Sequence, residues 1–426
     1  MVKGIRVVLI FIGGLTVWNQ STRSDGRTVA FQDPNRWAKK ANASNLALAG
    51  HYAQEIMAPD PTNHLGCREP DIDRYGYLRK DIVVNPSHQR DFTVTQRKHF
   101  FALDLTQCVD RIRPLMSAII QSMQLLGPEN CALSIVEGRS TDGTFEVLQT
   151  LREKVEAMGA SFYLATNEAN PTKAGDDDKK ARVAILAELR NQALAPLLDS
   201  PAQYAPDTTI LFLNDVAPCA EDILELLHQR IQQKADMTCA MDWTYVGPHP
   251  SFYDVWISRG MTGDTFFDLP PSGSYDNHWD LFWNDRPAQN HFYNHKPFQV
   301  FSCWNGLVAL SAEPFVNGGL RFRGSKPEEC VQGEPQILAK DLWKMGHGKI
   351  AVVPSVNLAY DVESAQKVKE AKGYVSDWAR DGSSQQIEWE PKPPAKVKCM
   401  PTPKDQHWLP WDESLDSSDE SRVDLR

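Results

Sequence analysis

The chain has 426 residues, of which 42% are hydrophobic and 23% are charged. This length and composition are sufficient for one large domain, or two smaller ones, with a buried core. The formal net charge is −10, which argues against nucleic acid as a partner because no basic excess is available to neutralise phosphates. An acidic chain can still hold a local basic pocket for a nucleotide diphosphate.

The N-terminus predicts a membrane anchor. Lys3 and Arg6 precede an uncharged run over residues 7–22, which is short for a spanning helix because such a helix needs about 20 apolar residues. We predict an uncleaved signal anchor over residues 1–22, with a cleaved signal peptide as the alternative. Positive charge before the run would keep the tip in the cytosol. The expectation is a single-pass type II protein of the Golgi or another secretory-pathway membrane, with the main part of the chain and the sequon at Asn42 in the lumen.

Two residue types point to the compartment and to the ligand. Eight cysteines show no CxxC pair and no Cys/His metal spacing, so in an oxidising lumen they allow one or two disulfides of open connectivity. Twelve tryptophans are present, and several fall between Trp243 and Trp304. Flat aromatic faces in that segment suit a carbohydrate site, while core packing is the alternative for each of them.

Helix and strand signals alternate through the middle of the chain. Residues 23–90 are predicted to be a stem and N-terminal extension, with one helix at about 45–57. The expected strands are 100–103, 132–136, 161–165, 209–213 and 237–241, and the expected helices are 109–126, 144–158, 181–198 and 221–233. This alternation predicts an α/β domain over residues 91–365, with a mostly parallel sheet and helices on both faces. Residues 366–426 are rich in Pro, Ser and charge and predict a polar, disordered tail.

Ligands of such sheets bind at the carboxyl ends of the strands, so the residues there are the candidates for chemistry. Glu137 ends the second expected strand and Asp142 opens the next helix; carboxylates here suit the imide N–H or hydroxyls of a nucleoside, or form a simple capped turn. Arg190 could contact a diphosphate or form a surface ion pair. Asn214 and Asp215 follow the fourth expected strand. An ionised Asp215 at the tip of an apolar strand needs a partner, and Mn²⁺ or Mg²⁺ shared with a diphosphate would supply one.

The order of these motifs resembles the GT-A type glycosyltransferases, and in detail the fungal capsule-associated mannosyltransferase family, which includes an α-1,3-mannosyltransferase. The matching stretches are SIVE (134–137), LRNQAL (189–194), FLNDV (212–216), FYDVW (252–256), SCWNG (302–306) and VPSV (353–356). The resemblance implies a GT-A fold, GDP-mannose as donor, a glycan acceptor, a divalent cation and retention of the α-configuration. It also assigns the metal to Asp215 and makes Asn214 a second contact, because Asn-Asp-Val stands where other families carry Asp-x-Asp.

The same stretches suggest residues for the sugars. Trp304 and Asn305 are implied to shape the sugar or acceptor pocket, and Asp254 and Trp256 lie in an aromatic segment that we assign to the same pocket. Asp242 follows the expected strand at 237–241 and is a candidate for donor binding. Structural hydrogen bonds are an equal alternative for Asp242 and Asp254.

Two further acidic residues complete the predicted site. Glu334 keeps the acidic position that the family has before a helix, so we expect it to act with Asp215 at the reacting centre. Its neighbours Gly333 and Pro335 depart from the family pattern, which leaves acceptor specificity open. Asp361 is expected to be a further metal contact.

Other functions stay as alternatives. A catalytically silent relative that binds glycan or scaffolds an assembly is possible, since an Asp at a strand tip does not prove turnover. A nucleotidyltransferase would show a Gly-rich phosphate loop and a following basic residue near the first strand, and residues 101–113 have no such loop. The chain has no GxGxxG, P-loop or GxSxG motif, which argues against a dehydrogenase, a kinase and a hydrolase.

Overall fold

The computed structural model describes residues 43–58, 65–79, 96–138, 140–171, 178–379 and 386–415. The predicted anchor over residues 1–22 and the sequon at Asn42 lie outside these residues. Within the described ranges, no helix is both long enough and apolar enough to cross a membrane.

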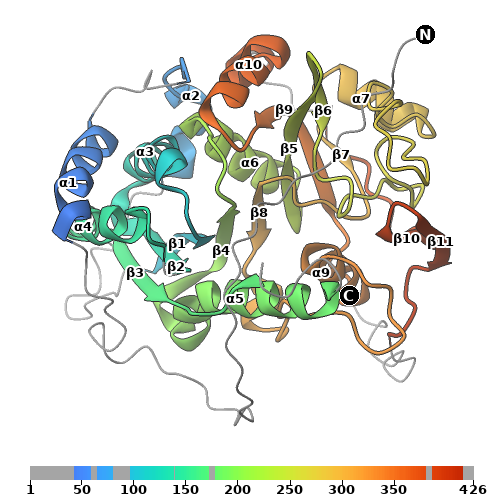
Figure 1. The fold of residues 1–426 in the computed structure, drawn as a ribbon, viewed down its shortest axis with the longest axis horizontal. Helices are drawn as coiled ribbons and strands as arrows, with labels where there is room; N and C mark the ends of the chain where they lie inside the picture. Colours follow the sequence, from blue (N-terminus) through green and yellow to red (C-terminus); the bar gives the residue numbers. More distant parts are fainter. Residues whose placement is uncertain are drawn as a thin grey trace, which may run out of the picture. The chain divides into compact units, whose positions relative to one another are not determined.

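A mixed sheet of nine strands forms the centre of the described domain (Figure 1). The strands are β1 Arg97–Leu105, β2 Cys131–Glu137, β3 Ser161–Thr166, β4 Tyr204–Leu213, β5 Met237–Val246, β6 His249–Phe252, β7 Phe298–Gln299, β8 Leu307–Ser311 and β9 Ile350–Leu358. Their order across the sheet is β3-β2-β1-β4-β8-β5-β9-β7, with β6 paired to β5.

The prediction of a mostly parallel sheet is only partly correct. Strands β1 to β4, β5 and β9 share one direction, whereas β6, β7 and β8 run against their neighbours. The reversal of β6 has a simple cause, because two residues join it to β5 and a turn that short permits only antiparallel pairing. Strands β7 and β8 come after the part of the chain in which helices and strands alternate. The alternation that predicts parallel strands therefore does not extend to them.

Every helix expected between residues 98 and 241 is present, with small shifts at the ends. The helices are α1 Ala43–Met57, α2 Ile72–Tyr75, α3 Val109–Leu126, α4 Thr144–Ala157, α5 Lys179–Asp199, α6 Ala220–Gln232, α7 Arg286–Tyr293, α8 Glu313–Val316, α9 Glu334–Lys344, α10 Val362–Lys372 and α11 Val375–Trp378. These positions agree with the sequence because apolar residues recur at helical spacing, as with buried Leu148, Leu151 and Val155 in α4.

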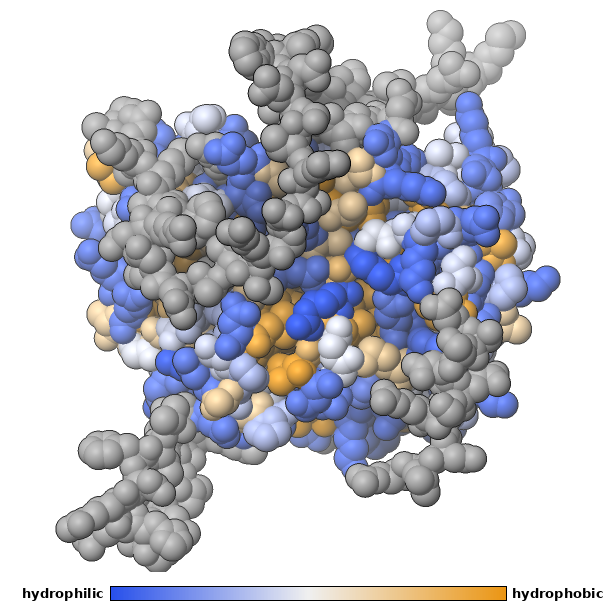
Figure 2. Space-filling view, turned by 90° about the horizontal axis from the view of Figure 1, so that it is seen from below, coloured by the Kyte–Doolittle hydropathy of each residue, from blue (hydrophilic) through white to orange (hydrophobic). Residues whose placement is uncertain are grey.

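Helices cover both faces of the sheet, as predicted. Successive side chains of a strand point to opposite faces, and on β1 Phe100 and Ala102 belong to one core while Phe101 and Leu103 belong to the other. Helices α5, α8 and α9 contribute to the first core, and α1, α3, α4 and α6 to the second. On the face shown in Figure 2, hydrophilic residues dominate and hydrophobic ones gather in a patch near the middle.

The extension before residue 90 is part of this domain, so the predicted boundary there is wrong. Helix α1 contacts α3 and α4, and its residues Ala49, Ala53 and Ile56 are buried in the second core. A disulfide joins Cys67 to Cys219. The apolar stripe of α1 is too short to stand out in the sequence, and contact with α3 and α4 is what buries it.

The prediction of a disordered C-terminal tail is wrong for residues 386–415. Strands β10 Lys396–Thr402 and β11 Asp405–Pro410 form an antiparallel hairpin, and a disulfide joins Cys399 to Cys330. Val397 and Met400 are buried. The prediction missed these buried residues because it used the average composition of the segment, in which charged and proline residues surround them.

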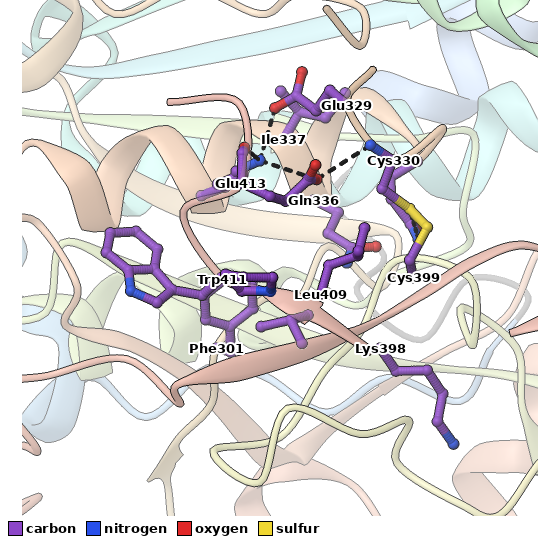
Figure 3. A pocket seen from close by; sticks show the side chains of 14 residues that line it. Phe301, Glu329, Cys330, Gln336, Ile337, Lys398, Cys399, Leu409, Trp411 and Glu413 are labelled. Atoms are coloured by element: carbon purple, nitrogen blue, oxygen red, sulfur yellow. Dashed lines mark hydrogen bonds and ion pairs between the residues drawn. A yellow bond between two sulfur atoms is a disulfide. The ribbon is translucent and has the colours of Figure 1, made fainter. Parts of the chain in front are cut away.

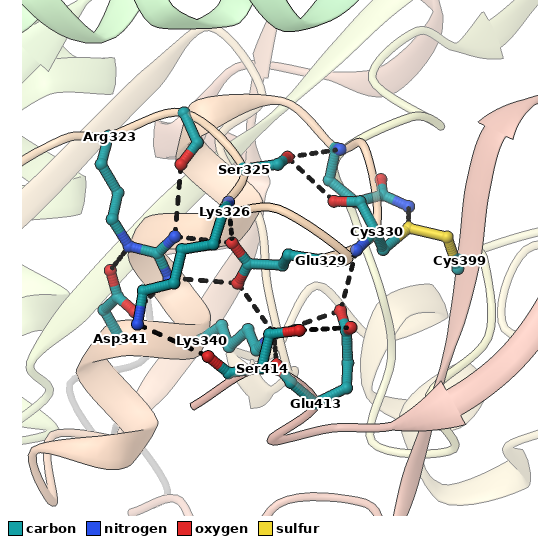
Figure 4. Close-up of polar contacts among 12 residues, drawn as sticks. Arg323, Ser325, Lys326, Glu329, Cys330, Lys340, Asp341, Cys399, Glu413 and Ser414 are labelled. Carbon is teal, nitrogen blue, oxygen red and sulfur yellow. Dashed lines mark hydrogen bonds and ion pairs between the residues drawn. A yellow bond between two sulfur atoms is a disulfide. The ribbon is translucent and has the colours of Figure 1, made fainter. Parts of the chain in front are cut away.

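Ion pairs hold the loop before α9 to the C-terminal segment (Figure 4). Arg323 pairs with Glu329 at 2.6 Å and with Asp341 at 2.8 Å. Lys340 lies 2.9 Å from the same Glu329 and 3.2 Å from Glu413. Burial would raise the pKa of Glu329, but hydrogen bonds from Arg323, from a backbone amide and from Lys340 lower it to about 2. The carboxylate therefore stays ionised at neutral pH and fixes the segment that leads into α9.

A small cavity of about 30 Å³ lies under this hairpin (Figure 3). Phe301, Ile337, Leu409 and Trp411 are among the residues that line it. Ligand pockets usually have volumes of about 300 Å³ or more, so this cavity is a packing defect between α9 and the hairpin.

Candidate active site

The strand ends bring the predicted residues to one edge of the sheet. Leu105 at the end of β1 pairs with Glu137 at the end of β2, and Leu103 pairs with Leu213 at the end of β4. Strand β8 enters the sheet at the same edge, where its Leu307 is opposite Leu213. Residues that follow different strands, and that are far apart in the sequence, therefore meet here.

Hydrogen bonds link four side chains across this edge. Trp304 Nε1 donates to Asn214 Oδ1 at 3.0 Å, and Asn214 Nδ2 donates to the Tyr360 hydroxyl at 3.5 Å. The Tyr360 hydroxyl in turn donates to Asp242 Oδ2 at 2.8 Å. The Asn214 side chain is thus held between two neighbours, and its predicted contact with a metal stays a prediction. Tyr360 had no role in the sequence prediction, although it follows the VPSV stretch of the family resemblance.

Asp242 and Asp254 form a pair of acidic groups in the site. The Asp254 backbone N–H donates to Asp242 Oδ1 at 3.3 Å, and the Asn305 N–H donates to Asp254 Oδ2 at 3.0 Å. Burial, and next the nearby Asp254, raise the pKa of Asp242 well above its usual range. Burial also raises the pKa of Asp254 to about 6, although the hydrogen bond from Asn305 works in the opposite direction. These carboxyls can therefore carry a proton near neutral pH.

Arg190 and Glu334 form a buried ion pair. Arg190 Nε donates to Glu334 Oε1 at 2.7 Å, and the guanidinium lies 4.4 Å from the centre of the Trp304 ring. Arg190 Nη1 is 3.9 Å from Asp104 Oδ1, and no described residue forms a hydrogen bond with this nitrogen. The alternative of a surface ion pair for Arg190 is therefore wrong. Its contact with a diphosphate is untested, and the observed partner of the charge is Glu334.

Asp104 is a candidate that the sequence analysis missed. It lies one residue before the end of β1, its side chain is 15% exposed, and burial raises its pKa to about 6. Arg190 lowers this pKa, while Glu334 and Asp215 raise it. The signal that identified Asp215, an acidic residue closing an apolar strand, is also present in the FFALDL stretch.

Asp215 is open to solvent at the end of β4. Its side chain is 33% exposed, and its Oδ2 lies 3.3 Å from Nη1 of Arg111. Helix α6 is capped by Cys219 and Asp222, so Asp215 does not cap it. Helix capping is therefore excluded for this residue, whose partner in the structure is Arg111; its predicted contact with a metal stays a prediction.

The two predicted nucleoside contacts differ in the structure. Glu137 is buried and accepts a hydrogen bond from the Ser140 N–H through Oε1, while its Oε2 has no partner among the described residues. Asp142 uses both oxygens: Oδ1 accepts from the Thr144 N–H at 3.1 Å, and Oδ2 from the Val109 N–H at 3.0 Å. Asp142 thus caps two helices, while Glu137 is fully buried and keeps one oxygen without a partner among the described residues.

The predicted pair of metal ligands is not assembled as a metal site. Asp361 is exposed and caps α10, since its Oδ1 accepts from the Ser364 N–H at 2.7 Å. In the part of the chain that the structure describes, no group of three or more His, Cys, Asp or Glu residues could hold a metal ion. A metal at Asp215, with or without Asp361, stays a prediction.

Three residues predicted for the sugar pocket have structural contacts. Trp304 is only 2% exposed, and Arg190 covers one face of its ring. Asn305 accepts from the Ser258 hydroxyl at 2.7 Å and donates to a backbone carbonyl. Trp256 Nε1 donates to the Met400 carbonyl at 2.8 Å and so holds the C-terminal hairpin. Their predicted contacts with a sugar stay predictions, and the observed contacts are with other groups of the protein.

The turn that contains Trp304 needs an unusual backbone. Asn305 and Gly306 have φ of 56° and 81°, and a Cβ on Gly306 would lie 2.8 Å from a Val216 methyl group, so glycine is required there. A disulfide between Cys239 and Cys303 anchors the turn. The described residues thus contain three disulfides instead of the one or two expected, and Cys108 and Cys131 are free and buried.

Comparisons with known proteins identify the family. A family model described as cryptococcal mannosyltransferase 1 matches residues 98–341. The alpha-1,3-mannosyltransferase CMT1 of Cryptococcus neoformans var. neoformans serotype D is 36% identical over 346 residues, which are 74% of this chain and 72% of that protein.

Two solved structures show weak similarity. The mannosyltransferase PcManGT from Pyrobaculum calidifontis, in complex with GDP-Man and Mn²⁺, has a TM-score of 0.35 and 11% identity over 80% of this chain and 77% of that one. GalNAc-T7 with UDP, GalNAc and Mn²⁺ has a TM-score of 0.37 and 12% identity over 62% of this chain and 42% of that one. These scores are too low to support a conclusion about ligands. The family model and the 36% identity confirm the family predicted from the motifs: this chain belongs to the cryptococcal mannosyltransferase 1 family and is a glycosyltransferase.

Proposed function

We propose that this enzyme has a GT-A fold and transfers an α-mannosyl group from GDP-mannose to a glycan acceptor, with retention of configuration and with the help of Mn²⁺ or Mg²⁺. Family membership supports the transfer of mannose, because the relative CMT1 is named for that activity. The observation that carries the site is Asp215, which lies two residues after the apolar strand β4 at the ligand edge, is 33% exposed and does not cap α6.

The residues at Asp215 fit a metal that has a single protein ligand. Mg²⁺ commonly binds one or two carboxylates and otherwise substrate phosphates and water, so Asp215 alone can hold it against a diphosphate. Asp361 caps α10, and this arrangement does not need Asp361 as a second metal ligand. When bound, the metal would neutralise the negative charge that develops on the leaving GDP.

The other residues of the edge have complementary tasks in this proposal. Arg111, 3.3 Å from Asp215, provides a second positive charge for the phosphates. Glu137 Oε2, which has no partner among the described residues, would accept a hydrogen bond from an N–H group of the guanine. The charges of Glu334 and Arg190 both act on the pKa of Asp254, so Asp254 lies near this pair. In this proposal it would bind sugar hydroxyls on the side of the acceptor.

The test compares two substitutions of predicted metal ligands. Asp215→Asn keeps the size of the side chain but removes its charge, so mannosyl transfer should fall by roughly 10²-fold or more, which is the effect of losing a strong electrostatic stabiliser of the transition state. Asp361→Asn is the matched control and should keep turnover, because Asn also caps helices well. Wild-type activity should disappear with EDTA and return with manganese, and calorimetry should rank GDP above UDP. Normal, metal-dependent turnover of the Asp215→Asn enzyme would refute the metal role, and tighter binding of UDP would refute the donor.

We also propose that the catalytic domain is luminal and anchored by residues 1–22 as a type II protein. The charge pattern of the N-terminus supports this orientation. Three disulfides within the described residues support an oxidising compartment.

A further inference from the structure

A second cavity is lined by none of the residues assigned to the strand-end site. Its volume is about 390 Å³, within the range of about 300 to 1,000 Å³ that small-molecule sites occupy. Residues of β5, β6, α7 and the end of α10 line it, together with the segment 278–281. None of these residues has a part in the proposed transfer reaction.

Aromatic side chains converge on this cavity. Trp279 is 68% exposed and Tyr293 is 57% exposed, although both line it, and the buried Trp243 also contributes to the wall. Single exposed aromatic residues are ordinary, but two large exposed rings beside a buried indole form flat apolar faces. The C–H face of a pyranose ring stacks on such surfaces while its hydroxyls stay in water.

The charge of the cavity contrasts with the charge of the chain. The chain has 55 Asp and Glu residues against 45 Lys and Arg, yet the cavity lining contains no acidic residue and includes His249, His278 and Lys372. The Lys372 ammonium lies 4.2 Å from the centre of the Trp243 ring, and no carboxylate of the described residues forms an ion pair with it. Burial lowers the pKa of Lys372, so an anion beside it would relieve a desolvation cost. Burial lowers the pKa of His278, and the nearby Asp276 acts in the opposite direction.

Two elements connect this cavity to the strand-end site. Strand β6 begins at His249 in the cavity and leads into Tyr253 and Asp254, and the Tyr253 ring lies 4.9 Å from that of Tyr360. Helix α10 begins two residues after Tyr360 and ends at Lys372. Its 11 residues span about 16 Å, a separation that an extended oligosaccharide can bridge.

We propose that this cavity binds an acidic sugar of the glycan acceptor, with the pyranose face on Trp279 and Tyr293 and the carboxylate beside Lys372. The inference rests on the proposed function only in assigning the sugar to the acceptor. The negative charge of the whole chain makes the cavity selective, because anions are repelled elsewhere and are stabilised at the Lys372 ammonium, which has no ion-pair partner among the described residues.

The test measures binding of hexagalacturonic acid, a chain of uronic acids, to the full-length protein by calorimetry, with neutral mannohexaose for comparison. The wild type should bind the acidic hexamer at least tenfold more tightly than the neutral one. Trp279→Ala and Lys372→Gln should each weaken that binding about tenfold. The matched controls are Trp283→Ala, which removes an exposed Trp outside the cavity, and Lys367→Gln, which removes an exposed Lys of the same helix; both should bind as the wild type does.

Two results would overturn the inference. The first is no preference for the acidic hexamer over the neutral one, and the second is equal losses in the cavity variants and in the controls. GDP affinity and hydrolysis of GDP-mannose, measured in parallel, separate this inference from the proposed reaction, because Trp279→Ala should leave both unchanged. If GDP-mannose is not a donor but Lys372-dependent binding is found, the sugar site stands without the donor assignment.

Discussion

Removal of the charge of Asp104 should stabilise the free enzyme at neutral pH. The pKa of this carboxyl is raised from 3.8 to about 6, so between these pH values the folded chain binds more protons than the unfolded chain. Stability therefore falls as the pH rises through this window and stays lower above it. A tenfold change in proton affinity is worth 1.36 kcal/mol, so ionised Asp104 costs the fold about 3 kcal/mol at pH 7.5. The effect of Arg190 is already contained in this value.

Urea unfolding of the Asp104→Asn variant at pH 4 and pH 7.5 measures this cost. The variant should be more stable than the wild type by up to about 3 kcal/mol at pH 7.5, and nearly equal to it at pH 4, where native Asp104 is protonated. Asp199→Asn is the control, because Asp199 is exposed. If Asp104→Asn lowered stability at pH 7.5, attraction to Arg190 would outweigh the burial of the carboxylate, and the reasoning would be wrong.

Two further predictions concern the ion pair and the topology. Glu334→Gln removes one charge of the buried ion pair with Arg190, and breaking such a pair costs about 3–5 kcal/mol. The urea midpoint and mannosyl transfer should therefore both fall, while GDP affinity should change little. Unchanged turnover would limit Glu334 to a structural role. In sealed microsomes, protease should spare residues 91–365 unless detergent is added, and their digestion without detergent would contradict the type II topology.

Local signals in the sequence were sufficient for most of the α/β framework. Helix α3 begins and ends where its apolar spacing predicts, because one face of that pattern must be buried. The position of Asp215 at the ligand edge also followed from the sequence, since a run of apolar residues delivers it to the end of a strand. The family was identified from the order of such motifs.

Contacts between distant segments were not predictable in the same way. The C-terminal hairpin appeared disordered because its average composition is polar, and its order depends on the disulfide between Cys399 and Cys330 and on the ion pair of Lys340 with Glu413. Helix α1 likewise needs α3 and α4 to bury its apolar face.

The sequence by itself determined the type of domain, the family and which residues could do chemistry, because those properties depend on residue type and local spacing. The tertiary structure decided which of the candidates are open to a ligand. Trp304 and Asn305 are buried by the fold, Asp142 and Asp361 are used as helix caps, and Asp215 alone among the predicted metal ligands lacks such a role. The physical reason is that the hydrogen bonds and burial of a polar group depend on partners from distant parts of the chain, and these partners come together only in the folded state.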